Sequence, residues 1–511
     1  MAASGAHGYQ ILRRIGRRLG RRNEGYVLIV AMLVMCAVLL LGGVLLLQVQ
    51  RNQQHVQRDR AYTQSFAIAE AGLNQYLWMV ASGMSSEVND FAIPGASEED
   101  PHKMAYVFLD PYDSSVQGEY VMEVTPPSAN EPNITVTVTG KSNQPVEQSR
   151  TVSAHLGRPA FSEYLLLTNE EVWIGGPLDR VWHGKTHSNT GICIDTADLT
   201  DLVCCARQTY VSSMFGGSHD GVWSGWEHTV PLSSPSRSLW QFPVPAVDFG
   251  TVTSDFARLG ELAQGTGVNL PYSTAGPHNE RRGWYIQLLP NEKYQIRRVT
   301  DEYESRNYSH GSRVGGYLTY ESPPSPISSG AYDYPEDGVI YVNDHVWVEG
   351  TNLHGRITIA SSGQLNPPGK TAATSIHIVG DLSYSQKDGS VAVGLIAQNN
   401  IEIPAYAPYQ KGGQVSRMDM EVDAALIAQQ GREYSRAADL GGPTRDYLAM
   451  YGSVSSCLQP YRYSTGGGGF ANGENTYDPY LLHNPPPYFP TVGTYQILDW
   501  RELPLSQAVE V

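Results

Sequence analysis

Residues 26–47 read YVLIVAMLVMCAVLLLGGVLLL, a run of 22 residues without one charged side chain. As a helix rising 1.5 Å per residue, this run is about 33 Å long, which is enough to cross the hydrocarbon core of a bilayer. A secretory signal has a shorter apolar region followed by a small-x-small cleavage site, and the sequence has neither. The run therefore predicts a transmembrane helix from Tyr26 to Leu47.

The charges on either side of this run predict its orientation. Six arginines lie between residues 13 and 22, and the next basic residue is Arg51. Because basic residues are retained on the cytoplasmic side of a membrane, residues 1–25 are expected inside the cell as a leader. Everything after about residue 50 is then expected outside the cytoplasm.

The helical pattern continues beyond the membrane to about residue 82. Residues 48–82 contain no proline and one glycine, Gly72. Apolar side chains recur there at three- and four-residue steps and form a predicted packing stripe that includes Phe66, Ala69, Leu73 and Leu77. One interpretation is a core helix close to the membrane, and the other is a rod that packs against copies of itself or its partners.

Two short segments of this helix carry a resemblance to a known family. NEGYVLIVAML at residues 23–33 resembles the processing motif of type IV prepilins. RDRAY at residues 58–62 and FAIAEAGL at residues 66–73 resemble the PilX N-terminal family of minor pilins. The resemblance implies that a prepilin peptidase cleaves after Gly25 and methylates the new amino terminus at Tyr26.

One departure from the family pattern narrows what the resemblance implies. Most pilins have a glutamate at the fifth mature position, whereas this sequence has Val30. The resemblance therefore implies a minor, PilX-like structural subunit of a type IV pilus or a type II secretion pseudopilus, which assembles through its N-terminal helix. The implied partners are membrane lipid, other pilins or pseudopilins and the prepilin peptidase. The implied location is the bacterial inner membrane, with a single pass, the main body outside and final residence in a pilus.

The remainder of the chain predicts a mainly β fold. Residues 83–160 are expected to form a small pilin-like module, because 120–124, 134–138 and 151–156 alternate like three antiparallel strands. Short apolar runs separated by turn residues over 161–460 predict a β-solenoid or β-helix-like body, with a β-sandwich as the alternative.

Two parts of this outer region depart from the regular pattern. An irregular insertion is expected at about residues 200–330, which are rich in tryptophan, proline and serine. The segment 461–511 is rich in proline and tyrosine, and NPPPYFP at residues 484–490 predicts an extended strap across one end of the solenoid.

Composition excludes nucleic acid as a partner. The formal net charge of the 511 residues is -16, although the first 25 residues contribute six arginines and only one acid. The outer region is therefore more acidic than the whole chain. Because affinity for nucleic acid depends on basic side chains that neutralise phosphates, we expect no such binding.

Five cysteines are too few for a disulfide framework. Cys193 lies close enough in sequence to Cys204 and Cys205 for one disulfide in the oxidising space outside the cytoplasm. Their spacing is not that of a zinc site. We expect no metal and no cofactor.

Two further functions stay open from the residues alone. An anchored adhesin or carbohydrate-binding protein would use aromatic side chains such as Trp223, Trp226, Trp240 and Trp284. An anchored polysaccharide enzyme would need converging carboxylates, and the candidates are Asp344, Asp381, Asp388 and Asp423. Weak metal-binding candidates are the pair His183 and His187 and the acids Asp195, Asp198 and Asp201. We nevertheless predict no enzyme activity and assign no catalytic residue.

Overall fold

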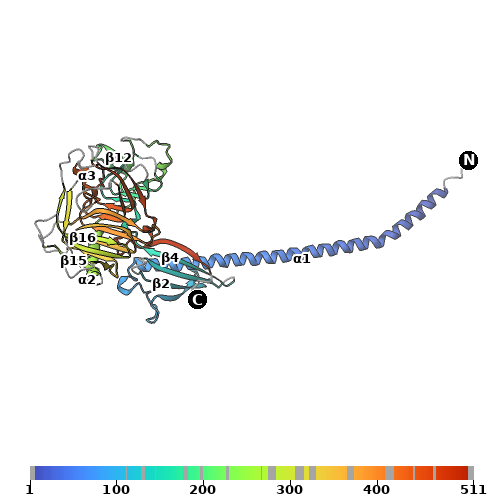
Figure 1. Cartoon of the computed structure of the whole chain (residues 1–511). Helices are drawn as coiled ribbons and strands as arrows, with labels where there is room; N and C mark the ends of the chain where they lie inside the picture. Colours follow the sequence, from blue (N-terminus) through green and yellow to red (C-terminus); the bar gives the residue numbers. More distant parts are fainter. Residues whose placement is uncertain are drawn as a thin grey trace.

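The structure is a computed structural model of the whole chain. It describes residues 6–110, 112–127, 133–143, 146–175, 182–195, 199–225, 230–265, 267–273, 283–304, 316–321, 330–364, 373–408, 419–440, 444–463 and 468–504. The fold is mainly β with one long helix, as predicted. That helix, α1 (Ala6–Ala81), projects from the β-rich part of the molecule (Figure 1).

A five-stranded antiparallel sheet covers the C-terminal quarter of α1. Its strand order is β1-β2-β3-β4-β30. The strands are β1 (Lys103–Leu109), β2 (Val116–Thr125), β3 (Ile134–Ser142), β4 (Gln148–Gly157) and β30 (Gln496–Leu503). The three predicted strands are confirmed as parts of β2, β3 and β4, but β1 and β30 were not predicted. We call this sheet, with residues 61–81 of α1, the sheet module.

The sheet module has its own hydrophobic core between α1 and one face of the sheet. Ile68, Ala69 and Tyr76 of the helix are fully buried against strand residues that include Met122 and Val138. The alternating pattern of the strands places these apolar side chains on the face turned toward the helix.

A glycine permits the closest contact between helix and sheet. A Cβ atom at Gly140 of β3 would lie 2.4 Å from the carbonyl oxygen of Ser65 and 2.5 Å from the amide nitrogen of Ala69. Both atoms belong to the backbone of α1, so neither can move aside as a flexible side chain would. The absence of a side chain at this position therefore sets the distance between the two layers.

The larger part of the chain is a β-rich body made of parallel ladders. The first ladder runs through β15 (Val268–Leu270), β20 (Val339–Val342), β22 (Arg356–Ser361), β24 (Ala392–Ala397), β26 (Asp419–Ala428), β28 (Thr444–Ser456), β5 (Leu166–Thr168), β8 (Thr186–Ser188), β10 (Val203–Cys205) and β14 (Trp240–Gln241), in that spatial order. Every pairing along it is parallel. The strands of this ladder are stacked in parallel, and the solenoid-like body stays a prediction.

Further ladders lie beside the first. One consists of β16 (Gly283–Leu289), β21 (His345–Leu353), β23 (Ile376–Tyr384), β25 (Ile401–Ile403) and β27 (Glu433–Ser435), and another of β6 (Val172–Ile174), β9 (Ile192–Ile194) and β13 (Val222–Trp223). β23 joins two ladders, because its first residues pair with β25 while Leu382 pairs with Val422 of β26. The ladders thus enclose a common core.

Smaller elements complete the body. β29 (Gly469–Tyr477) pairs with β28 and with β7 (Trp182–His183), while β17 (Lys293–Glu304) pairs antiparallel with β16, β18 (Gly316–Tyr320) and β19 (Tyr332–Asp333). β11 (Thr209–Val211) and β12 (Ser218–Asp220) form a hairpin. The helices are α2 (Thr251–Gly265) and the short α3 (Arg436–Leu440).

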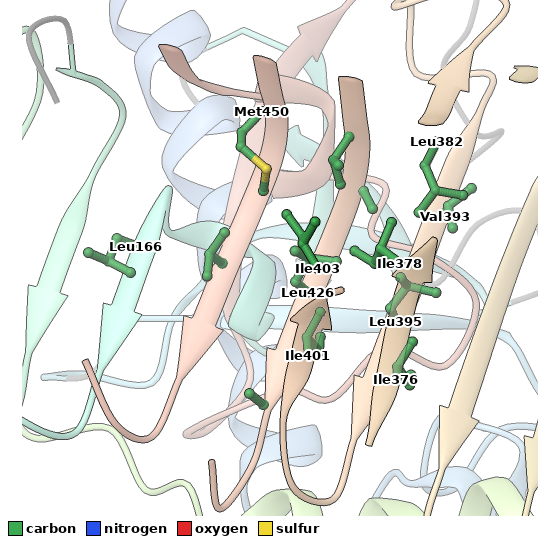
Figure 2. Packing of buried hydrophobic residues seen from close by; sticks show 14 of the residues in the cluster. Leu166, Ile376, Ile378, Leu382, Val393, Leu395, Ile401, Ile403, Leu426 and Met450 are labelled. Carbon is green, nitrogen blue, oxygen red and sulfur yellow. The ribbon is translucent and has the colours of Figure 1, made fainter. Parts of the chain in front are cut away.

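The core of the body consists of aliphatic side chains that repeat from rung to rung. Figure 2 shows Ile376 and Ile378 of β23 beside Val393 and Leu395 of β24, with Ile401 and Ile403, Leu426 and Met450 on the following strands. Each rung buries its apolar residues only against its neighbours, which is how a solenoid is stabilised.

The chain enters this stack in the middle and not at an end. β5 is the first strand of the body, and it pairs with β28, which comes almost 300 residues later. From β5 the chain builds rungs as far as β14, passes through α2 to β15 at the opposite end, and returns rung by rung to β28. Strands β10 and β13–β16 belong to the ladders, so much of the expected insertion at 200–330 is part of the stack.

The proline-rich segment connects the body to the sheet module. Thr358 of β22 donates a hydrogen bond to the carbonyl oxygen of Pro487 (2.5 Å), and the amide of Val492 donates to the carbonyl of Pro159 (2.7 Å). The chain then forms β30 at the edge of the sheet. We call residues 484–492 the strap.

We predict that Gly140→Ala destabilises the sheet module, because its Cβ would collide with the backbone of α1. The loss should be about 1–3 kcal/mol of unfolding free energy, measured by denaturant unfolding of the full chain in detergent. Gly265→Ala, at the end of α2, is the matched control, because a Cβ there meets no atom within 4 Å. Equal stability of the two variants would contradict the close packing described above.

Candidate functional site

The apolar segment of α1 has no cover within the molecule. Its side chains are exposed from Tyr26 to Leu47, with Gly42 half-buried, and the large ones such as Leu40 are up to 72% exposed. The helix is long and apolar enough, by length and composition, to cross a membrane. Exposure of this many apolar side chains to water is very unfavourable, at about 25 cal/mol for each Å². The segment therefore requires lipid or other protein around it.

The predicted packing stripe lies farther along α1 and is used within the chain. Ala69 and Leu73 are buried in the core of the sheet module, while Phe66 and Leu77 are partly buried at its margin. The stripe therefore packs on the chain's own sheet. In the described part of α1, the segment left for other molecules is 26–60.

The residues of the predicted processing site lie where the apolar segment begins. Gly25 is within α1, and Tyr26 is the first exposed aromatic residue of the segment. Val30 is 39% exposed, the lowest value among the large apolar side chains of residues 26–47.

A charged and aromatic cluster ties the helix to the β4–β30 edge of the sheet module. The guanidinium carbon of Arg150 on β4 lies 3.8 Å from the ring centre of Tyr62 and 4.5 Å from that of Phe66. Arg150 also donates to Glu502 of β30, and this hydrogen bond lowers the pKa of the Glu502 carboxyl. One side chain thus joins α1, β4 and the last strand of the chain.

A cavity of about 880 Å³ lies where the sheet module meets α2 and the strap. Its lining comes from β4 and the loops that adjoin the sheet module (Asp90, Phe91, Pro127, Asn133, Gly157, Arg158), from α2 (Asp255, Arg258, Leu259, Glu261, Leu262, Gly265) and from the strap and the residues after it (Pro485, Pro486, Pro487, Tyr488, Phe489, Thr491, Tyr495). We call it the junction cavity. Its volume is within the range of small-molecule sites, which often lie between structural units.

Ionic groups and aromatic rings alternate on the wall of the junction cavity. Arg158 lies over the ring of Tyr495 at 5.3 Å, and Arg258 over the ring of Tyr488 at 5.6 Å. Burial raises the pKa of the Asp255 carboxyl, while the charges of the two arginines oppose this rise. The Oδ2 atom of Asp255 is buried and accepts no hydrogen bond from the described residues.

The carboxylates suggested for an enzyme do not form one site. Asp344 is fully buried and accepts hydrogen bonds from the amides of Ser273 and His345. Asp388 caps a surface turn through the amide and hydroxyl of Ser390. Asp381 and Asp423 are on neighbouring strands, β23 and β26, and each accepts from a backbone amide. These carboxylates support turns and strands.

The suggested metal ligands are also separated. His183 is exposed on β7, whereas His187 is buried on β8 and contacts Asn189. Asp195 accepts from the indole of Trp173, Asp201 caps the amide of Leu202, and Asp198 lies outside the described residues. Within the described ranges, no group of three His, Cys, Asp or Glu is placed to hold a metal ion.

The structure contains no disulfide between the cysteines of its described residues. Cys193 is buried on β9, whereas Cys204 and Cys205 are buried on β10 in a different ladder. The structure therefore does not form the predicted bridge. Burial raises the pKa of the Cys204 and Cys205 thiols, which lowers their reactivity.

The tryptophans suggested for sugar binding are scattered. Trp223 stacks on His219 with ring centres 3.7 Å apart, Trp240 lies under Arg237, and Trp284 donates to the carbonyl of Pro271. Trp226 lies outside the described residues. The junction cavity contains none of them, so the tryptophan pattern does not predict it. Its one signal in the sequence is NPPPYFP at 484–490, which predicts a strap but not a cavity.

Comparison with known proteins gives little beyond the geometry. No protein-family model and no curated protein matches this chain. Among solved structures, the competence-associated pilin ComZ from Thermus thermophilus matches with 12% identity and a TM-score of 0.28, over 87% of this chain and 97% of that one. A TM-score this low does not establish a common fold, so the following proposals depend on the residues alone.

The raised pKa of Asp423 predicts a specific pH dependence of the unfolding free energy. Its burial raises the pKa from 3.8 to about 6, so the folded state holds the proton more tightly than the unfolded state. The resulting stabilisation is complete below pH 3.8 and is lost as the pH rises through about 6. Relative to Asp423→Asn, the wild-type chain should therefore lose roughly 2 kcal/mol of unfolding free energy between pH 4 and pH 7.

Thermal unfolding in detergent at these two pH values measures this difference. Asp388→Asn is the control, because the pKa of the exposed Asp388 is lowered and its contribution has the opposite sign. A wild-type chain that gains stability relative to Asp423→Asn over the same interval would show that Asp423 is ionised by its Lys387 contact and not neutralised by burial.

Proposed function

We propose that this protein is a membrane-anchored, pilin-like structural subunit that assembles through α1. The observation that carries the proposal is the division of α1 into two parts. Residues 26–47 are apolar and uncovered, whereas residues 61–81 pack firmly on an antiparallel sheet. This is the layout expected of a pilin, in which one end of the helix is available first to lipid and later to neighbouring subunits.

The resemblance of the sequence supports the finer assignment to the minor, PilX-like pilins. The motifs at 23–33 and 58–73 lie in α1, one at the start of the apolar segment and one across the point where packing on the sheet begins. Val30 in place of the usual glutamate favours a low-copy subunit over the repeating one. This proposal is the same whether the filament is a type IV pilus or a secretion pseudopilus.

The proposed orientation places the N-terminus in the cytoplasm of a bacterium and the body outside the inner membrane. Its support is the charge asymmetry of the sequence, with six arginines before the apolar segment and none until Arg51. In this orientation the prepilin peptidase meets Gly25 on the cytoplasmic side, and the sheet module forms outside.

We propose that the body has a structural role and is not catalytic. Asp344, Asp381 and Asp388 bond to the backbone of strands and turns, which stabilises the fold. A polysaccharide enzyme would need two carboxylates that face a common substrate. We therefore expect no glycan cleavage by the purified chain.

Processing of the leader is the first test of this proposal. When the full chain is expressed with a prepilin peptidase, intact-protein mass spectrometry should find a chain that begins at a methylated Tyr26. Gly25→Leu should retain the leader, because a bulky side chain blocks entry of the backbone into the peptidase site. Gly20→Leu, in the same basic arm, is the control and should be processed as the wild type is. A chain that keeps Met1 under these conditions would refute the assignment to pilins.

A further inference from the structure

The sheet module and the body have separate hydrophobic cores. Leu156 of β4 and Tyr495, just before β30, pack in the core between α1 and the sheet. Phe161 and Val492 pack in a different core, which includes Phe256 of α2 and strand residues of the body. In the described parts of the chain, no residue belongs to both of these cores. Each core can therefore stay intact if the sheet module and the body move relative to one another.

Two short linkers connect the cores and lie side by side. The first consists of residues 157–160 and the second of residues 493–494. Ala160 of the first linker forms an antiparallel bridge with Thr491, which lies two residues before the second. A hinge needs only a few residues at the ends of structural elements to absorb the change in backbone angles. Because the two linkers are neighbours in space, rotation at both would turn the body as one unit.

A glycine gives the second linker conformational freedom. Gly493 has a φ angle of 72°, in the left-handed region that favours glycine. A Cβ atom at this position would meet no other atom within 4 Å, so the linker is surrounded by open space. The backbone can therefore rotate at Gly493 without displacing a packed neighbour.

The space between the sheet module and the body is not filled by side chains. The junction cavity, of about 880 Å³, lies beside both linkers, because Gly157, Arg158 and Tyr495 are part of its lining. Protein interiors elsewhere are packed with few voids larger than a water molecule. Relative movement is expected of two folded parts unless a large hydrophobic interface joins them. The cavity takes the place of such an interface here.

His483 holds the junction from the side of the body. It follows the short helix η4 (Pro479–Leu482), whose Leu481 is buried in the core of the body. The side-chain amide of Asn133, before β3, donates to the carbonyl oxygen of His483, and the Nδ1 atom of His483 lies 3.7 Å from the Oδ2 atom of Asp499 on β30. Both partners belong to the side of the sheet module. One hydrogen bond and one exposed ionic contact are weak enough to break and form again.

We propose that residues 157–160 and 493–494 form a hinge on which the body turns relative to α1, with His483 as its latch. In the latched state the contacts of His483 fix the width of the junction cavity. In the open state these contacts are broken, while both cores keep their packing. The hinge does not depend on the pilin-like function, because it uses no residue of the exposed segment 26–60. Either proposal can fail alone.

Double electron–electron resonance on the full chain in detergent measures this movement. Spin labels at Thr125→Cys, at the end of β2, and at Glu261→Cys, on α2, lie on opposite sides of the boundary, and both positions are exposed. The accessible native cysteines are removed as Cys36→Ser and Cys457→Ser, whereas the other three are buried and stay unlabelled. The distribution of distances between the two labels reports the angle of the hinge.

The double variant Asn133→Ala/His483→Ala removes both latch contacts. The two side chains are at least partly exposed, so the variant should fold, and its unfolding midpoint verifies this. The ratio of open to latched molecules should rise about tenfold, which is seen as a second distance in the distribution.

His155→Ala is the matched control for the latch. His155 also contacts Asp499, with 2.7 Å between Nδ1 and Oδ1, but it lies on β4 of the same sheet as Asp499. The control should therefore keep the wild-type distribution of distances. A folded double variant with the wild-type distribution would overturn the proposal, and so would a control that broadens as much as the double variant does.

Discussion

The close contact between α1 and the sheet at Gly140 is the constraint on which the arrangement of this molecule depends. A Cβ at that position would overlap the backbone of Ser65 and Ala69, so helix and sheet lie closer here than a side chain at residue 140 would allow. This contact stops the helix from turning on the sheet and directs its apolar segment away from the body (Figure 1). The exposed segment therefore extends away from the body as part of one continuous helix.

Other contacts of the same sheet join α1 to β30, the last strand of the chain. β30 pairs with β4 at the edge of the sheet, and Arg150 connects Glu502 of β30 to Tyr62 of the helix. The strap that leads to β30 crosses β22 and closes one side of the junction cavity. Anchoring, assembly and the shape of the junction cavity thus all depend on the packing of α1 on the sheet. A change at the helix–sheet contact should therefore alter all three.

The sequence predicted the local parts of this fold and missed the parts that depend on distant pairing. The charge-free run at residues 26–47 predicted the apolar helix, and the two-residue alternation of apolar side chains predicted β2, β3 and β4. The stripe through Ala69 and Leu73 was recognised, but periodicity alone does not tell whether a stripe meets its own sheet or another molecule. The pairing of β30 with β4 and that of β5 with β28 join residues about 300 or more positions apart. No local sequence pattern predicts such pairings. The junction cavity was missed for the same reason, since five separate segments of the chain form it.

Hydrogen–deuterium exchange of the full chain in lipid vesicles tests the division of α1 most directly. The amides of residues 26–47 should exchange slowly because lipid surrounds them, and those of 61–81 because they pack on the sheet. Residues 48–60, which are exposed and lie between the two, should exchange faster than either. Rapid exchange throughout 26–47, or uniform protection from 26 to 81, would contradict the account.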